Sequence, residues 1–111
     1  MRILTCVHTM EIGGSQFNAI EIAGQMAALG HEAFVYGPPG DLQPVVEQLG
    51  LEFIEGPTKG PHLSRRSMAL LRRTVRDRNI DIIHAYEWAP ALDAAYAPFL
   101  IDGVPLVTTV L

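Results

Sequence analysis

The sequence predicts a parallel α/β fold, on the strength of three observations. Short apolar runs alternate along the chain with longer segments of helical periodicity. The first run, Ile3–Val7, is almost continuously apolar, as expected of a strand buried on both faces of a parallel sheet. A loop with Gly13 and Gly14 then leads into a helical pattern, and strand, glycine loop and helix form the opening unit of such a fold.

The later segments repeat this unit, with Gly, Pro and Asp at the breaks between elements. The predicted strands are Ile3–Val7, Glu32–Tyr36, Leu51–Ile54, Asp81–His84 and Pro105–Val110. The predicted helices are Gln16–Leu29, Leu42–Leu49, Ser64–Arg78 and Pro90–Leu100. We expect Ser15 and Asp41 to cap the first two helices, Pro98 to kink the last one, and Tyr86–Ala89 to form a loop.

The two longest helical patterns differ in their surroundings. Apolar residues fill well over half of the circumference of Gln16–Leu29, which predicts a largely buried helix. The pattern over Ser64–Arg78 has a single apolar stripe and carries almost all the positive charge of the chain. That charge indicates either a solvated outer face or a contact with anionic lipid headgroups or an acidic acceptor, for which Arg72, Arg73 and Arg76 are the candidates.

The length, composition and charge of the chain exclude several classes of protein. The 111 residues are enough for one domain, and 49% hydrophobic with 18% charged residues is typical of a globular protein. The net charge of −4 argues against nucleic-acid binding. The apolar runs are far shorter than the ~20 residues of a spanning helix, and no leader pattern is recognisable, so we expect a cytoplasmic protein. The single Cys6 excludes an internal disulfide and is expected to be an inert buried thiol, with a reactive thiol as the alternative.

The last predicted strand raises the question of what covers it. If Pro105–Val110 lies inside the sheet, one of its faces needs a covering helix that this sequence does not contain. An uncovered apolar face is an association surface. We therefore expect that residues 1–111 form one incomplete domain of a longer protein, or one partner of an assembly that pairs through the unfinished sheet.

The glycine loop is the first candidate binding site. The first N–H groups of a helix have no partner within it, so Gly13, Gly14 and Ser15 can cradle a phosphate or diphosphate. The alternative is a tight turn that lets the helix approach the strand. The pair matches neither the GxGxxG dinucleotide fingerprint nor a Walker loop.

Polar residues at strand ends form the second candidate site. In a parallel sheet His8 and His84, at the carboxyl ends of two strands, lie on the ligand-binding rim together with the glycines. His84 can contact a sugar hydroxyl or, alternatively, hydrogen-bond within the loop. Tyr86 and Glu87, followed by Trp88, suit carbohydrate binding, although Trp88 can also pack under the next helix. No metal-ligand spacing and no catalytic triad is recognisable, so we expect no metal or other cofactor.

These segments together resemble the N-terminal domain of family 4 glycosyltransferases of the GT-B type. The matching stretches, in order, are ILTCV, EIGGSQ, ALGHEAFVYGP, DIIHAYEWAP and GVPLVTTV. The resemblance covers essentially the whole chain and implies a Rossmann-like α/β/α half with a parallel sheet of about five strands. It also implies transfer of a sugar from a nucleotide-sugar donor to an acceptor, with retention of configuration and without a metal ion.

The resemblance assigns roles to individual residues. Gly13 and Gly14, with Ser15, would face the donor diphosphate, and His84 would lie near the reacting sugar as the catalytic residue. His8, Tyr86 and Glu87 would line the acceptor side. The sequence departs from the family pattern at Tyr86, where the second histidine of a His-x-His motif is expected.

The donor-binding C-terminal domain of such enzymes has no counterpart in these residues. We therefore expect no turnover by residues 1–111 alone. The basic helix would contact the membrane as a peripheral surface if the acceptor is lipid-linked. The alternatives are a stand-alone ligand-binding or interaction module of flavodoxin type, and another GT-B-shaped enzyme such as a sugar epimerase.

Overall fold

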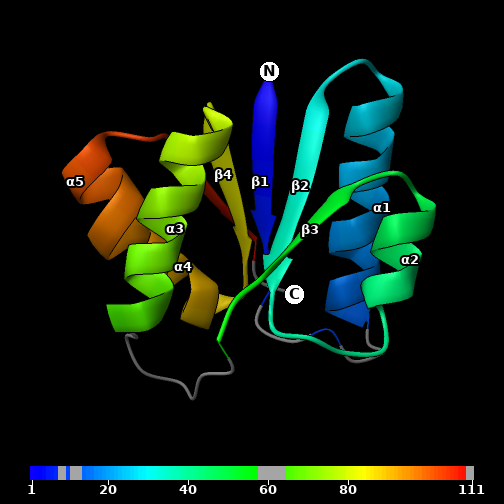
Figure 1. The fold of residues 1–111 in the computed structure, drawn as a ribbon, viewed down its shortest axis with the longest axis horizontal. Helices are drawn as coiled ribbons and strands as arrows, with labels where there is room; N and C mark the ends of the chain where they lie inside the picture. The colour runs from blue at the N-terminus through cyan, green and yellow to red at the C-terminus, as the bar shows by residue number, and fades with distance from the viewer. Residues whose placement is uncertain (8–9, 11–13, 58–64, 110–111) are drawn as a thin grey trace.

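The computed structural model describes residues 1–7, 10, 14–57 and 65–109 of the chain (Figure 1). Its strands are β1 (Arg2–Cys6), β2 (Glu32–Gly37), β3 (Glu52–Glu55), β4 (Ile82–Tyr86) and β5 (Leu106–Thr109). Its helices are α1 (Gly14–Ala28), α2 (Gln43–Gln48), α3 (Arg65–Arg78), α4 (Trp88–Ala94), the π-helical turn η1 (Ala95–Phe99) and α5 (Leu100–Asp102). Each predicted strand and helix therefore has a counterpart in the structure.

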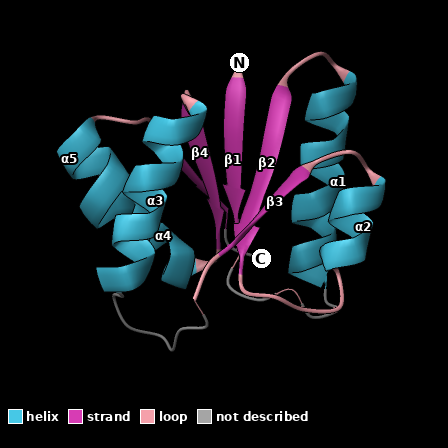
Figure 2. Ribbon diagram, viewed as in Figure 1, coloured by secondary structure: helices cyan, strands magenta, loops and turns pink. Residues whose placement is uncertain are grey.

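The strands form one parallel sheet in the order β3-β2-β1-β4-β5. The chain first moves from β1 outward to β3 and then returns past β1 to β4 and β5. Because parallel crossovers are right-handed, the two directions place their helices on opposite faces. Figures 1 and 2 show α1 and α2 on one side of the sheet and α3, α4 and α5 on the other. The predicted Rossmann-like α/β/α architecture is confirmed.

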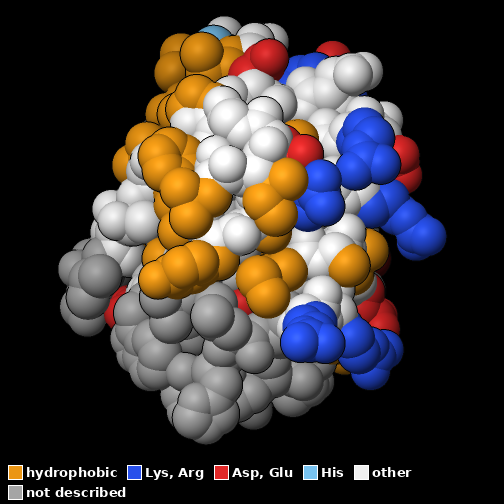
Figure 3. Space-filling view, turned by 90° about the vertical axis from the view of Figure 1, so that its left-hand side faces the viewer, with side chains coloured by type: hydrophobic (Ala, Val, Ile, Leu, Met, Phe, Trp, Pro, Cys, Tyr) orange, Lys and Arg blue, Asp and Glu red, His pale blue; other side chains and the backbone are white. Residues whose placement is uncertain are grey.

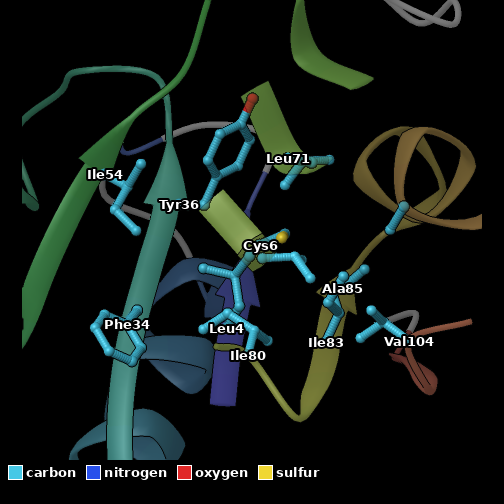
Figure 4. Close-up of a cluster of buried hydrophobic side chains, with 12 residues drawn as sticks. Leu4, Cys6, Phe34, Tyr36, Ile54, Leu71, Ile80, Ile83, Ala85 and Val104 are labelled. Carbon is cyan, nitrogen blue, oxygen red and sulfur yellow. The ribbon is translucent and has the colours of Figure 1, made fainter. Parts of the chain in front are cut away.

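Strand alternation divides the core between the two faces of the sheet. On the α3–α4 face, Leu4 and Cys6 of β1 pack with Ile83 and Ala85 of β4 and with Leu71 of α3 (Figure 4). On the α1–α2 face the cluster contains Val35, Ala19, Ile20, Val46 and Tyr86, among others. Burial on both faces explains why the strand sequences read as nearly continuous apolar runs.

Several element boundaries differ from the prediction. β4 continues to Tyr86, which the sequence placed in a loop, because Tyr86 pairs with Thr109 of β5. The N-cap of α2 is Leu42 and no side chain caps it, so the expected Asp41 cap is wrong. The expected kink at Pro98 takes the form of the π-helical turn η1, since proline has no N–H to continue the α-helical pattern.

The face of the sheet beside α1 carries an apolar groove of about 340 Å³. It is lined by alternate residues of β1 and β4, by Val107 of β5 and by three residues of α1. The described residues of its lining are Met1, Ile3, Thr5, Ile22, Ala23, Met26, His31, Ile82, His84 and Val107. Within the described part of the chain no helix covers this groove. Consequently α1 is less buried than its sequence predicts: Ile22 and Met26 are only partly buried, and the side chain of Phe17 is exposed.

The surroundings of two glycines predict opposite effects of alanine substitution on stability. A Cβ on Gly40 would lie 2.8 Å from the carbonyl carbon of Met10, so Gly40→Ala is expected to lower the free energy of unfolding by about 1–3 kcal/mol. Gly24 lies inside α1, and a Cβ there meets only the flexible Leu49 side chain at 3.4 Å. Gly24→Ala is therefore expected to raise stability by up to about 1 kcal/mol. Urea denaturation of both variants checks this, and destabilisation of both would contradict the packing described.

Candidate functional site

The candidate site lies where the strand order of the sheet reverses. β1 and β4 are neighbours, but the connections after them leave in opposite directions. The crevice beyond the carboxyl ends of such a strand pair is where open α/β sheets bind ligands. Both α1 and α4 begin at this edge, so helix N-termini face it from the two sides of the sheet (Figure 1). The topology thus brings together the ends of β1 and β4, as the sequence predicted.

The first turn of α1 supplies backbone donors to this crevice. Gly14 is the first residue of α1 and Ser15 the second, which places Ser15 inside the helix rather than at the predicted N-cap. No acidic side chain lies in this turn to occupy the free N–H groups. His8 and Gly13, which the sequence places at the same rim, lie outside the described residues, as does the side chain of Ser15.

His84 is the central side chain of the site. It projects from β4 to the α1 face, where its Nε2 atom lies 2.7 Å from Thr109 Oγ1 of β5. Its ring also contacts the Tyr86 ring, with centroids 4.4 Å apart. Partial burial lowers the pKa of the imidazole below its ordinary value, so it is neutral near pH 7. A neutral imidazole held by one hydrogen bond can form a second one, through its other ring nitrogen, with a ligand hydroxyl.

Tyr86 lies beneath His84 rather than at the surface. Its side chain is 1% exposed and packs with Val7 and with Ala19 and Ile20 of α1. Burial raises the pKa of its hydroxyl. In the described part of the chain, this hydroxyl is the buried side-chain polar atom that has no hydrogen-bond partner. The arrangement suits a ring that supports His84 better than one that contacts an acceptor directly.

Glu87 turns the chain out of β4 towards α4. Its φ of 66° lies in the left-handed region that non-glycine residues rarely adopt. Its backbone N–H donates to the Thr109 carbonyl oxygen at 2.8 Å, so the pairing with β5 holds this conformation. Residues in such conformations concentrate at functional sites, because the surrounding structure must maintain them.

A buried polar cluster on the opposite face of the sheet was not expected from the sequence. Tyr36 Oη lies 2.8 Å from Ser67 Oγ, and Asp93 of α4 is fully buried nearby. The three residues border a cavity of about 10 Å³, the size of one water molecule. Burial, with a further contribution from Asp93, raises the pKa of Cys6, so the thiol is protonated and the inert alternative is supported. The only sign of this cluster in the sequence was the carboxylate of Asp93 within an apolar helical run.

The structure separates the arginines that the sequence grouped as one basic patch. Arg72 donates two hydrogen bonds to Asp102, of 2.9 and 3.2 Å, and Arg78 pairs with Glu52. Arg73 instead borders a hollow beside β3, on another side of α3. Figure 3 shows Arg side chains on one half of this surface and apolar side chains on the other, where η1 and α5 expose Tyr96, Phe99, Leu100 and Ile101.

Among the described residues, no group of three His, Cys, Asp or Glu side chains lies close enough together to hold a metal ion. No helix in the same residues has the length and hydropathy needed to cross a membrane.

The Tyr86 hydroxyl, which has no hydrogen-bond partner among the described residues, allows a test of this packing. Tyr86→Phe keeps the ring against His84 and removes this buried polar atom, so it is expected to raise stability by about 1 kcal/mol. Tyr36→Phe is the matched control, since it removes the hydrogen bond with Ser67 and is expected to lower stability by about 1 kcal/mol. The measurement is the free energy of unfolding in urea. A loss of stability in Tyr86→Phe would show that its hydroxyl is paired.

The lowered pKa of His84 predicts a pH dependence of stability. Between the lowered folded-state value and the ordinary value of 6.5, the unfolded chain binds the proton more strongly than the folded chain. Stability is therefore lost as the pH falls through this window. Wild type is expected to lose more stability than His84→Gln between about pH 7.5 and about pH 5, because glutamine does not titrate there. Equal losses in urea denaturation would show that His84 keeps its ordinary pKa.

Comparison with known proteins identifies the family of this chain. The family model for glycosyltransferase family 4 matches residues 12–110. No curated protein matches the sequence significantly. Among solved structures, MurG from Acinetobacter baumannii matches with a TM-score of 0.78 at 14% identity, over 98% of this chain and 34% of MurG. A glycosyltransferase from Rickettsia africae ESF-5 matches with a TM-score of 0.77 at 19% identity, over 96% of this chain and 28% of that protein.

A smaller protein shares the topology more loosely. The universal stress protein from Archaeoglobus fulgidus matches with a TM-score of 0.55 at 13% identity, over 97% of this chain and 92% of that one. At these identities the structural matches show the fold alone. The chain spans about a third of the length of the two glycosyltransferase-type structures. Since the family model covers nearly all of residues 1–111, the chain belongs to glycosyltransferase family 4.

Proposed function

We propose that this chain is the acceptor-side domain of a retaining glycosyltransferase, which moves a sugar from a nucleotide-sugar donor to an acceptor. The observation that carries the proposal is the position of His84, which Thr109 holds by a hydrogen bond beside the crevice where the strand order reverses. Partial burial lowers the pKa of its imidazole. Membership of glycosyltransferase family 4 supports the reaction class. The whole enzyme would need a second domain for the donor nucleotide.

The proposed roles follow from the positions of the residues. The N–H groups of Gly14 and Ser15 at the start of α1, together with Gly13 outside the described residues, would bind the donor diphosphate, since a helix N-terminus carries positive partial charge. His84 would hydrogen-bond a hydroxyl of the reacting sugar as the catalytic residue. Tyr86 would act as a positioning residue, because its ring limits the rotation of the His84 ring. His8 and Glu87 would lie on the acceptor side, and no metal ion is part of the proposal.

A stand-alone binding module is the second candidate. The match to the universal stress protein shows that a chain of nearly this length can be a whole protein of related topology. The apolar groove beside α1 would then be covered by a second copy of the chain, whereas in a longer transferase a further segment would cover it. Such a module would bind a phosphorylated ligand at α1 without catalysis.

The direct test is sugar transfer by the intact protein that contains this chain. Nucleotide-sugars are offered with and without candidate acceptors, and products are followed by mass spectrometry. His84→Asn is expected to lower kcat by about 100-fold or more, a typical effect of losing a positioned polar group at the reacting centre. His31→Gln, at the amino edge of the sheet, serves as the control and is expected to keep full activity.

Three outcomes would change the proposal. Turnover by residues 1–111 alone would contradict the need for a second domain. Conversion of the nucleotide-sugar without acceptor would favour an epimerase. Binding without any turnover of the intact protein, together with self-association, would favour the stand-alone module.

A further inference from the structure

A hollow of about 490 Å³ lies on the face of the sheet opposite His84, between the end of β3 and the outer surface of α3. We call it the β3–α3 hollow. Its lining residues are Glu55, Gly56, Pro57, Arg66, Ala69, Leu70 and Arg73. The volume is in the range of small-molecule sites. It shares no residue with the site around His84 and α1.

The spacing of the lining residues on α3 shapes the hollow. Arg66, Ala69, Leu70 and Arg73 follow one another at intervals that place them on one side of a helix. The two arginines are two turns apart, about 10 Å along the axis, with the small and apolar pair between them. On the α3 side the hollow is therefore lined by Ala69 and Leu70, with Arg66 one turn before this pair and Arg73 one turn after it.

The opposite wall is held in place by the sheet. The Gly56 N–H donates to the Gly37 carbonyl oxygen at 2.8 Å, which continues the pairing beyond β3. The Tyr36 ring packs so closely on Gly56 that an added Cβ would lie 2.6 Å from it. The backbone of Gly56 therefore cannot shift without disturbing Tyr36 in the core, so this wall of the hollow is fixed.

The arginines of the hollow differ from the three whose ion pairs the structure shows. Arg2, Arg72 and Arg78 each pair with a carboxylate. Among the residues that the structure describes, Arg66 and Arg73 have no such partner, and neither does Glu55. Two unneutralised guanidiniums thus face one hollow together with a single carboxylate. Guanidinium groups bind phosphate through two parallel hydrogen bonds, which makes paired arginines a phosphate-recognition device.

We propose that the β3–α3 hollow binds a phosphorylated small molecule or headgroup that also carries hydroxyl groups. Arg66 and Arg73 hold the phosphate, Glu55 accepts hydrogen bonds from the hydroxyls, and Ala69 with Leu70 contacts the carbon chain. This second site goes beyond the proposed sugar transfer and does not depend on it. The ligand is either free in solution or the headgroup of an anionic lipid, and the experiment separates these two sources.

The test uses glycerol 3-phosphate as the soluble probe and phosphatidylglycerol vesicles as the lipid probe. The ¹⁵N-labelled chain is titrated with glycerol 3-phosphate, and the amide signals of Gly56 and Leu70 are followed. The double variant Arg66→Gln/Arg73→Gln is expected to bind about tenfold more weakly or worse, because both charge-assisted contacts are lost. The matched control is Arg65→Gln/Arg76→Gln, which makes the same charge change at exposed positions outside the hollow.

Saturable binding of glycerol 3-phosphate that only the first double variant loses supports a soluble ligand. Vesicle sedimentation that only the first double variant loses, without binding of the free probe, supports the headgroup. Equal losses in both double variants, or no binding to either probe, would overturn the proposal. Glu55→Gln gives an independent measurement: it is expected to tighten binding of inorganic phosphate by removing a repulsive charge, and unchanged or weaker binding contradicts the proposal.

Discussion

The pairing of β1 with both β2 and β4 is the constraint on which the rest of the structure depends. β1 is the central strand, and its register with the two neighbours places Leu4 and Cys6 in one core and Thr5 on the opposite face, all nearly inaccessible to solvent. Because the chain leaves β1 and β4 in opposite directions, this pairing also creates the crevice at which α1 begins and β4 ends, and His84 lies within β4 close to that end. Core packing and site geometry therefore share one cause.

The site itself is built from contacts between neighbouring strands. The Thr109 hydroxyl of β5 forms a hydrogen bond with His84, and the Thr109 carbonyl oxygen accepts one from the Glu87 N–H. The last strand therefore holds both His84 within β4 and Glu87 in the turn after it. Tyr86 completes the arrangement with its ring against His84, and its buried hydroxyl has no hydrogen-bond partner among the described residues.

The order and type of the elements could be predicted because each reflects a local period, two for strands and 3.6 for helices. What depends on distant partners could not. Tyr86 extends β4 only because Thr109 pairs with it, and the Arg72–Asp102 pair joins residues 30 positions apart. The burial of α1 was overestimated, since Ile22 and Met26 line an open groove and Phe17 is exposed. The sequence singled out His84 as the last residue of a predicted strand, but the structure places it inside β4, which ends at Tyr86. Asp93 had only its setting in an apolar run as a signal.

The central claim is that these residues work as one domain of a larger transferase, and the mass of the intact polypeptide in its source cells tests it most directly. An antibody against an exposed segment such as α3 would identify the polypeptide. The account predicts a product about three times as long as this chain, since residues 1–111 cover 34% of MurG and two full domains need that length. A product of only 111 residues would contradict the account and favour a binding module that covers its apolar groove by self-association.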